Sequence, residues 1–213
     1  MRRSGFMLAL GLSLLPLAAA RGLDAPKPGP DWEQARKDNE LVIYYRDAPN
    51  AEARDLRATG EVNAAPEVVF NAVTDFENYP KFMPYTKEAR IVQRVSDNVV
   101  LGYSLLNPPL VSARDYCIQL TFTKGSEANG GVFKSEWTAK PSAVPVRDGT
   151  VRVQVNNGSW LMEPIDGGHR TRVTYSLFTN PGGSIPRWLA NMSNTTAIPE
   201  LFKAVRKRAT GKE

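Results

Sequence analysis

Residues 99–123 read VVLGYSLLNPPLVSARDYCIQLTFT, and this stretch decides the class of fold. Large apolar residues recur at every second position in both of its halves, which is typical of β-strands with one buried face. We therefore predict two neighbouring strands of an antiparallel sheet, at 98–106 and 112–123. By this alternation the inward side chains are Val99, Leu101, Tyr103 and Leu105 in the first strand, and Tyr116, Ile118, Leu120 and Phe122 in the second.

The same two-residue period extends to either side of this stretch. Turn-forming pairs such as Asp97-Asn98 and Gly167-Gly168 separate the periodic segments. Further strands are predicted at 41–46, 56–63, 87–95, 131–140, 150–156 with an extension through Met162, and 170–179. Together the strands predict an antiparallel meander with one apolar face and one wet face.

Three segments have a helical pattern instead. A capping-box spacing predicts a short helix from Asp31 through about Asn39. A second helix, over 66–75, begins with a proline and has apolar residues at helical spacing. The third covers 185–208, and its apolar stripe consists of Trp188, Leu189, Met192, Leu201, Phe202 and Val205.

Residues 1–20 have the order of a secretory signal peptide. Arg2 and Arg3 precede a short apolar run, and three alanines that end at Ala20 form a cleavage site. The run is shorter than the roughly 20 residues of a membrane-spanning helix. We therefore expect export to the periplasm or the extracellular space after cleavage near Ala20, with a retained membrane anchor as the alternative. Residues 21–31 then form a proline-rich lead.

The composition is that of one soluble domain. Of the 213 residues, 42% are hydrophobic and 23% are charged, so the core needs neither a metal nor a disulfide. Removal of Arg2 and Arg3 leaves 25 of the 27 basic residues against 22 acidic ones, and the excess gathers near the basic tail at 209–213. Nucleic acid is therefore not an expected partner. The terminal charges suit a solvated helix end, with transient contact to an anionic membrane as the alternative.

Residues for catalysis or metal binding are scarce. The sequence has one cysteine, Cys117, and one histidine, His169, so we expect neither a zinc cluster nor a nucleophile with its base. Motifs for phosphate, dinucleotide and metal-dependent chemistry are absent, and Asp115 and Glu136 have no visible partner carboxylate. We expect no catalytic residue, no metal and no cofactor, and therefore no enzyme.

Aromatic residues with one polar atom are the more informative group. Each of them alone is more typical of a packed core. As a group, on a curved sheet against a long helix, they suit a largely apolar cavity with a few polar atoms, which an amphipathic ligand needs. The group consists of Tyr103, Tyr116, Trp137, Trp160, Tyr175 and Trp188.

Five stretches carry a family resemblance. They are WEQARKDNELVIYYR at 32–46, GEVNAAPEVVFNAVTD at 60–75, the pair Arg114-Asp115, GSWLMEP at 158–164 and, most specifically, NPGGSIPRWLANMSN at 180–194. They resemble the START lipid-transfer family, part of a wider cyclase and lipid-transport superfamily, over residues 32–208. DFENYPKFMP at 75–84 is similar to a turn of the coenzyme Q-binding and cyclase-like branch.

The resemblance implies an α+β helix-grip fold over 32–208, in which a curved antiparallel sheet wraps around a long C-terminal helix and encloses a hydrophobic cavity. It also implies noncatalytic binding and transport of a lipid or sterol-like molecule, with the last helix as lid, and we expect a monomer. The predicted ligand-binding residues are Leu101, Tyr103, Tyr116, Trp137, Val153 and Tyr175 by strand alternation, and Trp188, Leu189 and Met192 by their match to the lid.

Two other functions stay open. One is a cyclase or dehydratase-like enzyme of the same superfamily, which would require a buried acid or base among the inward residues. The other is an interaction module whose cavity is filled by side chains. The pair Arg114-Asp115 fits either a structural ion pair or recognition of a lipid headgroup.

Overall fold

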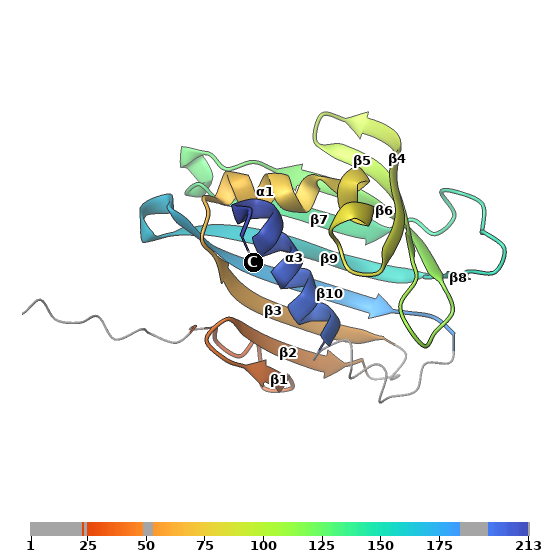
Figure 1. Cartoon of the computed structure of the whole chain (residues 1–213), viewed down its shortest axis with the longest axis horizontal. Helices are drawn as coiled ribbons and strands as arrows, with labels where there is room; N and C mark the ends of the chain where they lie inside the picture. The colour runs from red at the N-terminus through yellow and green to blue at the C-terminus, as the bar shows by residue number, and fades with distance from the viewer. Residues whose placement is uncertain (1–22, 24, 49–52, 184–195, 213) are drawn as a thin grey trace, which may run out of the picture.

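The computed structural model describes residues 23, 25–48, 53–183 and 196–212. One ten-stranded sheet forms its centre, in the order β1-β2-β3-β10-β9-β7-β6-β5-β4, with β8 beside β6 (Figure 1). Neighbours along this path are antiparallel, as predicted, whereas β8 is parallel to β6. The strands are β1 (Glu33–Lys37), β2 (Leu41–Asp47), β3 (Arg54–Val62), β4 (Thr86–Ser96), β5 (Val99–Leu106), β6 (Arg114–Thr123), β7 (Phe133–Ala139), β8 (Val151–Arg152), β9 (Val155–Ile165) and β10 (Arg170–Asn180).

The segment predicted as one strand from 150 through Met162 is divided in two. Val151 and Arg152 form β8 and pair with the start of β6. The chain then changes partners, and β9 pairs with β7 on one side and β10 on the other. A two-residue period in the sequence predicts an extended backbone, but it does not predict that the chain pairs with different strands before and after residue 154.

The predicted short helix from Asp31 to Asn39 is wrong, because this segment forms strand β1. Asp38 Oδ1 accepts hydrogen bonds from the backbone N–H groups of Glu40 and Leu41, each at 2.9 Å, and so makes the turn of a hairpin with β2. Trp32 packs on the outer face of that hairpin with Tyr44. Pairing with β2 therefore overrides the local helical signal.

Two short helical segments follow β3. Helix α1 (Pro66–Thr74) confirms the prediction over 66–75, and its Val69, Phe70 and Val73 are buried against the sheet. A 3-10 helix, η1 (Phe76–Lys81), continues directly from it and buries Phe76. Both helical segments thus cover the face of the sheet that carries the core.

Helix α3 (Ile198–Thr210) lies across the same face (Figure 1). Phe202 and Val205 have no exposed surface. The helix is held at both ends, because the Tyr85 hydroxyl donates to Glu200 at 2.8 Å and Arg208 pairs with the Asp75 carboxylate at 2.5 Å. Of the long helix predicted over 185–208, the part at 185–195 lies outside the described residues.

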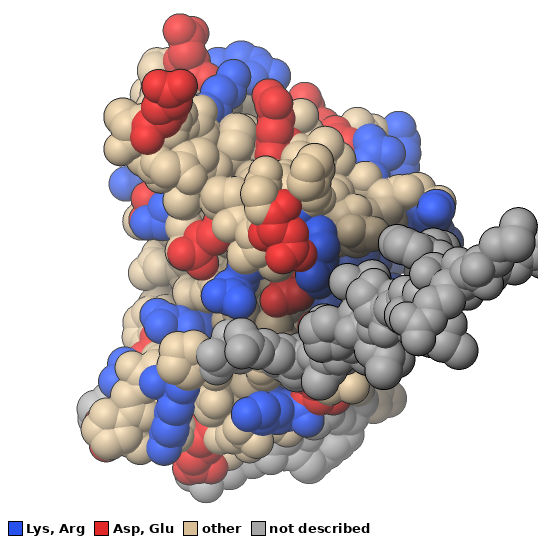
Figure 2. Space-filling view, turned by 90° about the vertical axis from the view of Figure 1, so that its left-hand side faces the viewer, with Lys and Arg blue, Asp and Glu red and all other residues tan. Residues whose placement is uncertain are grey.

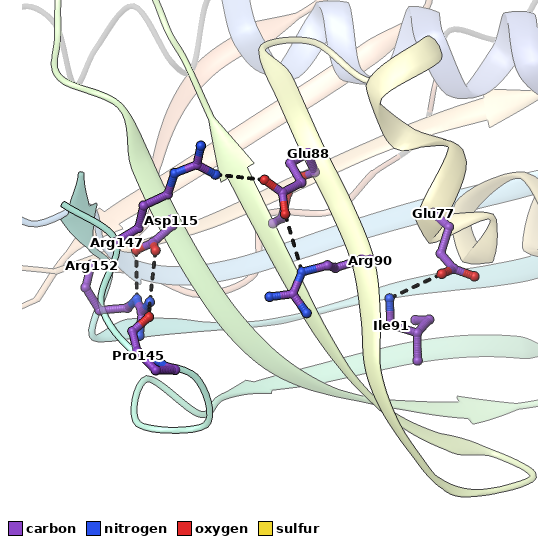
Figure 3. Close-up of polar contacts among 9 residues, drawn as sticks. Glu77, Glu88, Arg90, Ile91, Asp115, Pro145, Arg147 and Arg152 are labelled. Atoms are coloured by element: carbon purple, nitrogen blue, oxygen red, sulfur yellow. Dashed lines mark hydrogen bonds and ion pairs between the residues drawn. The ribbon is translucent and has the colours of Figure 1, made fainter. Parts of the chain in front are cut away.

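A buried ion pair occupies the opposite face of the sheet. The Arg152 guanidinium donates to both carboxylate oxygens of Asp115, at 2.7 and 2.9 Å, and to the carbonyl oxygen of Pro145 (Figure 3). It also donates to the carbonyl oxygens of Pro141 and Val144. Asp115 therefore pairs with Arg152 rather than with its neighbour in sequence. This pair fastens the loop between β7 and β8 to β6.

The N-terminal lead also packs on this opposite face. Leu23 is buried in a small cluster with Val42 and Tyr44, and the Tyr44 hydroxyl donates to the Ala25 carbonyl at 3.3 Å. Basic and acidic side chains are interspersed over the molecular face shown in Figure 2. Among the described residues, no helix has both the length and the apolar character needed to cross a membrane.

Replacing Asp115 by asparagine is expected to destabilise the fold strongly. The substitution leaves the buried Arg152 guanidinium without its counter-charge, which costs about 3 to 5 kcal/mol. Asp47→Asn is the matched control, because Asp47 is about half exposed and pairs with Arg54 at the surface, where a pair contributes about 1 kcal/mol or less. Urea denaturation measures both, and equal losses in the free energy of unfolding would contradict a structural role for the buried pair.

Candidate ligand cavity

A cavity of about 160 Å³ lies between the sheet, η1 and the first turns of α3. Most of its wall is apolar, and none of the described residues that line it carries a charge. The lining consists of Phe76, Tyr79, Met83, Pro84, Thr86, Leu106, Tyr116, Ile118, Leu120, Ser135, Trp137, Asn156, Trp160, Tyr175 and Leu201.

The inward face of β5 is made of small residues at the point where η1 approaches it. Gly102 lies opposite Ile118 and so faces the cavity side of the sheet. A Cβ atom on Gly102 would lie only 2.8 Å from the Phe76 ring, so that ring requires glycine here. Leu101 and Tyr103 consequently point to the opposite face, and their predicted inward orientation is wrong. The side chains on both faces of β5 are largely apolar, and the bulkier set, which includes Leu101 and Tyr103, lies on the face away from the cavity.

An aromatic wall closes the cavity on the side of β7, β9 and β10. The ring centroid of Tyr175 lies 4.5 Å from that of Trp160 and 5.8 Å from that of Trp137. Trp160 in turn lies 5.7 Å from Phe202 of α3, and the Trp137 indole N–H donates to Asn156 Oδ1 at 3.0 Å. The rings therefore support one another and tie the cavity wall to the helix.

Gly158 allows this wall to form. It lies opposite Trp137 in the pairing of β7 with β9. A Cβ atom at this position would lie 2.3 Å from the Ser176 carbonyl oxygen and 2.4 Å from the Trp137 ring. Only a residue without a side chain lets the indole approach the backbone of β9 this closely.

Three tyrosines contribute phenol groups to the cavity. Burial raises the pKa of Tyr79, Tyr116 and Tyr175 above the ordinary value, so all three stay protonated at neutral pH. The Tyr79 hydroxyl donates to the Val73 carbonyl, and the Tyr116 hydroxyl lies beside Ser104. Tyr175 makes no hydrogen bond through its hydroxyl within the part of the chain that the structure describes.

The structure brings some of the predicted ligand-binding residues together and separates others. Tyr116, Trp137 and Tyr175 line the cavity. Val153 is buried but lies outside the lining, next to the Asp115 carbonyl that accepts its N–H. Trp188, Leu189 and Met192 lie outside the described residues.

Sequence reasoning did not assign the segment after α1 to the cavity. Tyr79, Met83 and Pro84 all line it, although they belong to an irregular stretch. The sequence feature that could have indicated its role is the turn at 75–84, which is similar to a turn of the cyclase-like branch. Trp160 belonged to the aromatic group but was not among the predicted ligand-binding residues.

The groups that acid-base or metal chemistry would need are missing from the described part of the cavity. Its lining has no histidine, carboxylate, lysine or arginine. No set of three metal-ligating side chains occurs anywhere in the described ranges. His169 follows the turn η3 (Asp166–Gly168), and Cys117 is buried on the opposite face, where burial raises its pKa.

Arg114 lies near the cavity at the start of β6. Its side chain is buried and donates to three backbone carbonyls, those of Ser112, Pro181 at 3.3 Å and Gly182 at 3.5 Å. Burial lowers the pKa of this guanidinium. Arg114 therefore joins β6 to the segment that follows β10, and forms no ion pair with Asp115.

The curved sheet, the C-terminal helix and the apolar cavity between them define the helix-grip class of START-like lipid-binding domains. Residues 62–206 match the family described as polyketide cyclase / dehydrase and lipid transport, and the chain belongs to this family. The expected START-like helix-grip fold is thereby confirmed.

The chain is similar to known proteins over most of its length, as three examples show. An uncharacterized protein of Pseudomonas aeruginosa is 28% identical over 193 residues, which are 90% of this chain and 93% of that protein. The phosphatidylcholine transfer protein of Rattus norvegicus is 24% identical over 180 residues, 82% of each chain. A STAR-related lipid transfer protein from Xanthomonas axonopodis superposes with a TM-score of 0.73 at 26% identity, over 84% of this chain and 99% of that one.

Gly158→Ala is expected to disturb the aromatic wall. The added methyl group meets both a backbone oxygen and the Trp137 ring, and such overpacking costs about 1 to 3 kcal/mol. Gly29→Ala is the control, because a Cβ atom there makes an ordinary contact of 3.4 Å with Trp32. Thermal unfolding and tryptophan fluorescence measure the effect. A Gly158→Ala protein with unchanged stability and emission would show that the wall tolerates a different packing.

Proposed function

We propose that this protein binds a lipid or another hydrophobic molecule in its internal cavity and transports it without chemical change. The observation that carries the proposal is an apolar cavity whose described lining has only uncharged polar groups. Membership of a family of cyclases and lipid-transport proteins supports a cavity that holds hydrophobic molecules. The similarity to lipid-transfer proteins over most of the chain supports transport in particular.

The chemistry of the lining favours a carrier over a cyclase-like enzyme. A general acid or base works best with a pKa near the operating pH. The titratable groups among the described lining residues are phenols, and burial moves the pKa of each further from neutrality. None of them is therefore suited to exchange protons with a substrate near pH 7.

The size of the cavity favours a carrier over a module with a filled core. An engineered apolar cavity of about 150 Å³ is large enough to bind benzene or xenon. The cavity here has about that volume and an apolar wall, so it offers space that the described side chains leave free. A protein that only displays a surface to partners has no need for such a space.

Native mass spectrometry of protein purified without detergent tests this function. We expect a bound mass on the wild-type chain, and its loss in Leu120→Trp, because the larger ring fills the cavity that Leu120 lines. Leu101→Trp is the matched control on the opposite face of the neighbouring strand, and it should keep the bound mass. A wild-type protein that carries no ligand and takes none up from lipid vesicles would refute the carrier.

We also propose that the protein is exported, because Arg2, Arg3, an apolar run and Ala20 follow the order of a signal peptide. A cut after Ala20 would keep Leu23, which is buried against Val42. N-terminal sequencing of the mature protein should start at or near Arg21. Recovery of intact Met1 from the soluble cytoplasm would count against export.

A further inference from the structure

The polar groups of the cavity place a limit on what it can hold. The described lining offers hydroxyl and amide groups but no charged side chain. A phosphate or ammonium group placed against this lining would lose part of its water and gain no counter-charge, which is unfavourable. A neutral group loses far less on the same transfer and needs only hydrogen bonds in return.

Tyr175 is the polar group best placed to supply such a bond. Its ring is held between Trp160 and Trp137, so the side chain is fixed in position. Its hydroxyl has no hydrogen-bond partner in the described part of the chain. Because the residue lines the cavity, a ligand can reach this hydroxyl. A buried phenol without a partner is unusual, and a ligand in the cavity would provide one.

Tyr116 offers a second phenol to the same space. Its neighbour Ser104 donates its single proton to the Glu88 carbonyl at 3.1 Å. Both Tyr116 and Tyr175 stay protonated, because burial raises the pKa of each, and the nearby Tyr116 phenol raises the pKa of Tyr175 further. The pair can therefore donate to, or accept from, an uncharged oxygen, but cannot neutralise a cation.

We propose that the cavity selects a neutral amphiphile with a hydroxyl or carbonyl oxygen, and that the hydroxyls of Tyr175 and Tyr116 bind this oxygen. The inference rests on the proposed carrier function and names the class of its ligand. The volume of about 160 Å³ suits one ring system or one chain end near the phenols rather than two acyl chains.

The competing ligand is a phospholipid whose phosphate meets Arg114, the buried cation at the start of β6. The geometry disfavours it, because the Arg114 guanidinium already donates to the carbonyl oxygens of Ser112, Pro181 and Gly182. A phosphate would have to displace these bonds. The experiment below therefore offers phospholipids and neutral lipids together.

The test is a competition for uptake from vesicles. The full chain, freed of bound lipid, is incubated with vesicles of phosphatidylcholine and phosphatidylglycerol that carry traces of octadecanol, cholesterol and octadecane. The protein is isolated again, and mass spectrometry measures each bound lipid relative to its share in the vesicles. We expect at least one of the neutral oxygen-bearing lipids to be enriched by about tenfold or more over both phospholipids and over octadecane, as one well-made hydrogen bond allows.

The variant Tyr175→Phe removes the hydroxyl and keeps the ring. We expect it to lower the enrichment of the selected lipid by about tenfold while leaving octadecane uptake unchanged. Tyr44→Phe is the matched control, because the Tyr44 hydroxyl bonds to Ala25 on the opposite face of the sheet. Near-wild-type melting temperatures establish that both variants fold.

The outcomes separate this inference from the function on which it rests. One outcome is that phospholipid dominates the uptake and that Arg114→Gln, rather than Tyr175→Phe, weakens it. This result would agree with the carrier function and would refute a neutral ligand. Enrichment of a neutral lipid that Tyr175→Phe does not change would overturn the role of the phenol. Uptake of no lipid at all would refute the carrier function itself.

Discussion

The contact of Phe202 and Val205 with the sheet is the interaction on which the rest of the structure depends. Both side chains are fully buried, and Phe202 lies against Trp160 at the centre of the aromatic wall. A single helix on a wide curved sheet covers only part of it, so α1 and η1 must cover the remainder. The cavity is the space that these elements leave between them, and its position follows from where α3 is anchored.

The chemistry of the cavity follows from the different side chains on the two faces of the sheet. Charged residues of β4, β6 and β8 gather on the opposite face, where Glu88 and Asp115 bind arginines (Figure 3). The cavity face keeps rings, aliphatic groups and a few hydroxyls. The ion pairs of these strands thus lie away from the cavity, and Arg114, the buried cation nearest to the cavity, is held by backbone carbonyl oxygens instead. The cavity lining is therefore suitable for molecules without charge.

Most of the fold could be predicted from the sequence because its signals are local. Alternation along 112–123 gave the correct inward face of β6, and proline with apolar spacing located α1. The face of β5 could not be predicted this way, since the choice depends on Phe76, which arrives from another element. The partner of Asp115 lies 37 residues away at Arg152 and follows only from the register of β6 with β8. Likewise, no periodicity marks the irregular segment that brings Tyr79 and Pro84 to the cavity.

The place of β10 in the sheet has a consequence for the order of folding. This last strand pairs with β3 near the middle of the sheet, and the hydroxyls of Thr59 and Thr174 approach to 3.4 Å across a separation of 115 residues (Figure 1). Such long-range pairing closes a large loop before it yields any contact, so it forms slowly. The hairpins on either side of β10 can form early, but they cannot join into one sheet until the chain is almost complete. The joining of the two parts of the sheet through β10 is therefore a late step for a chain under synthesis.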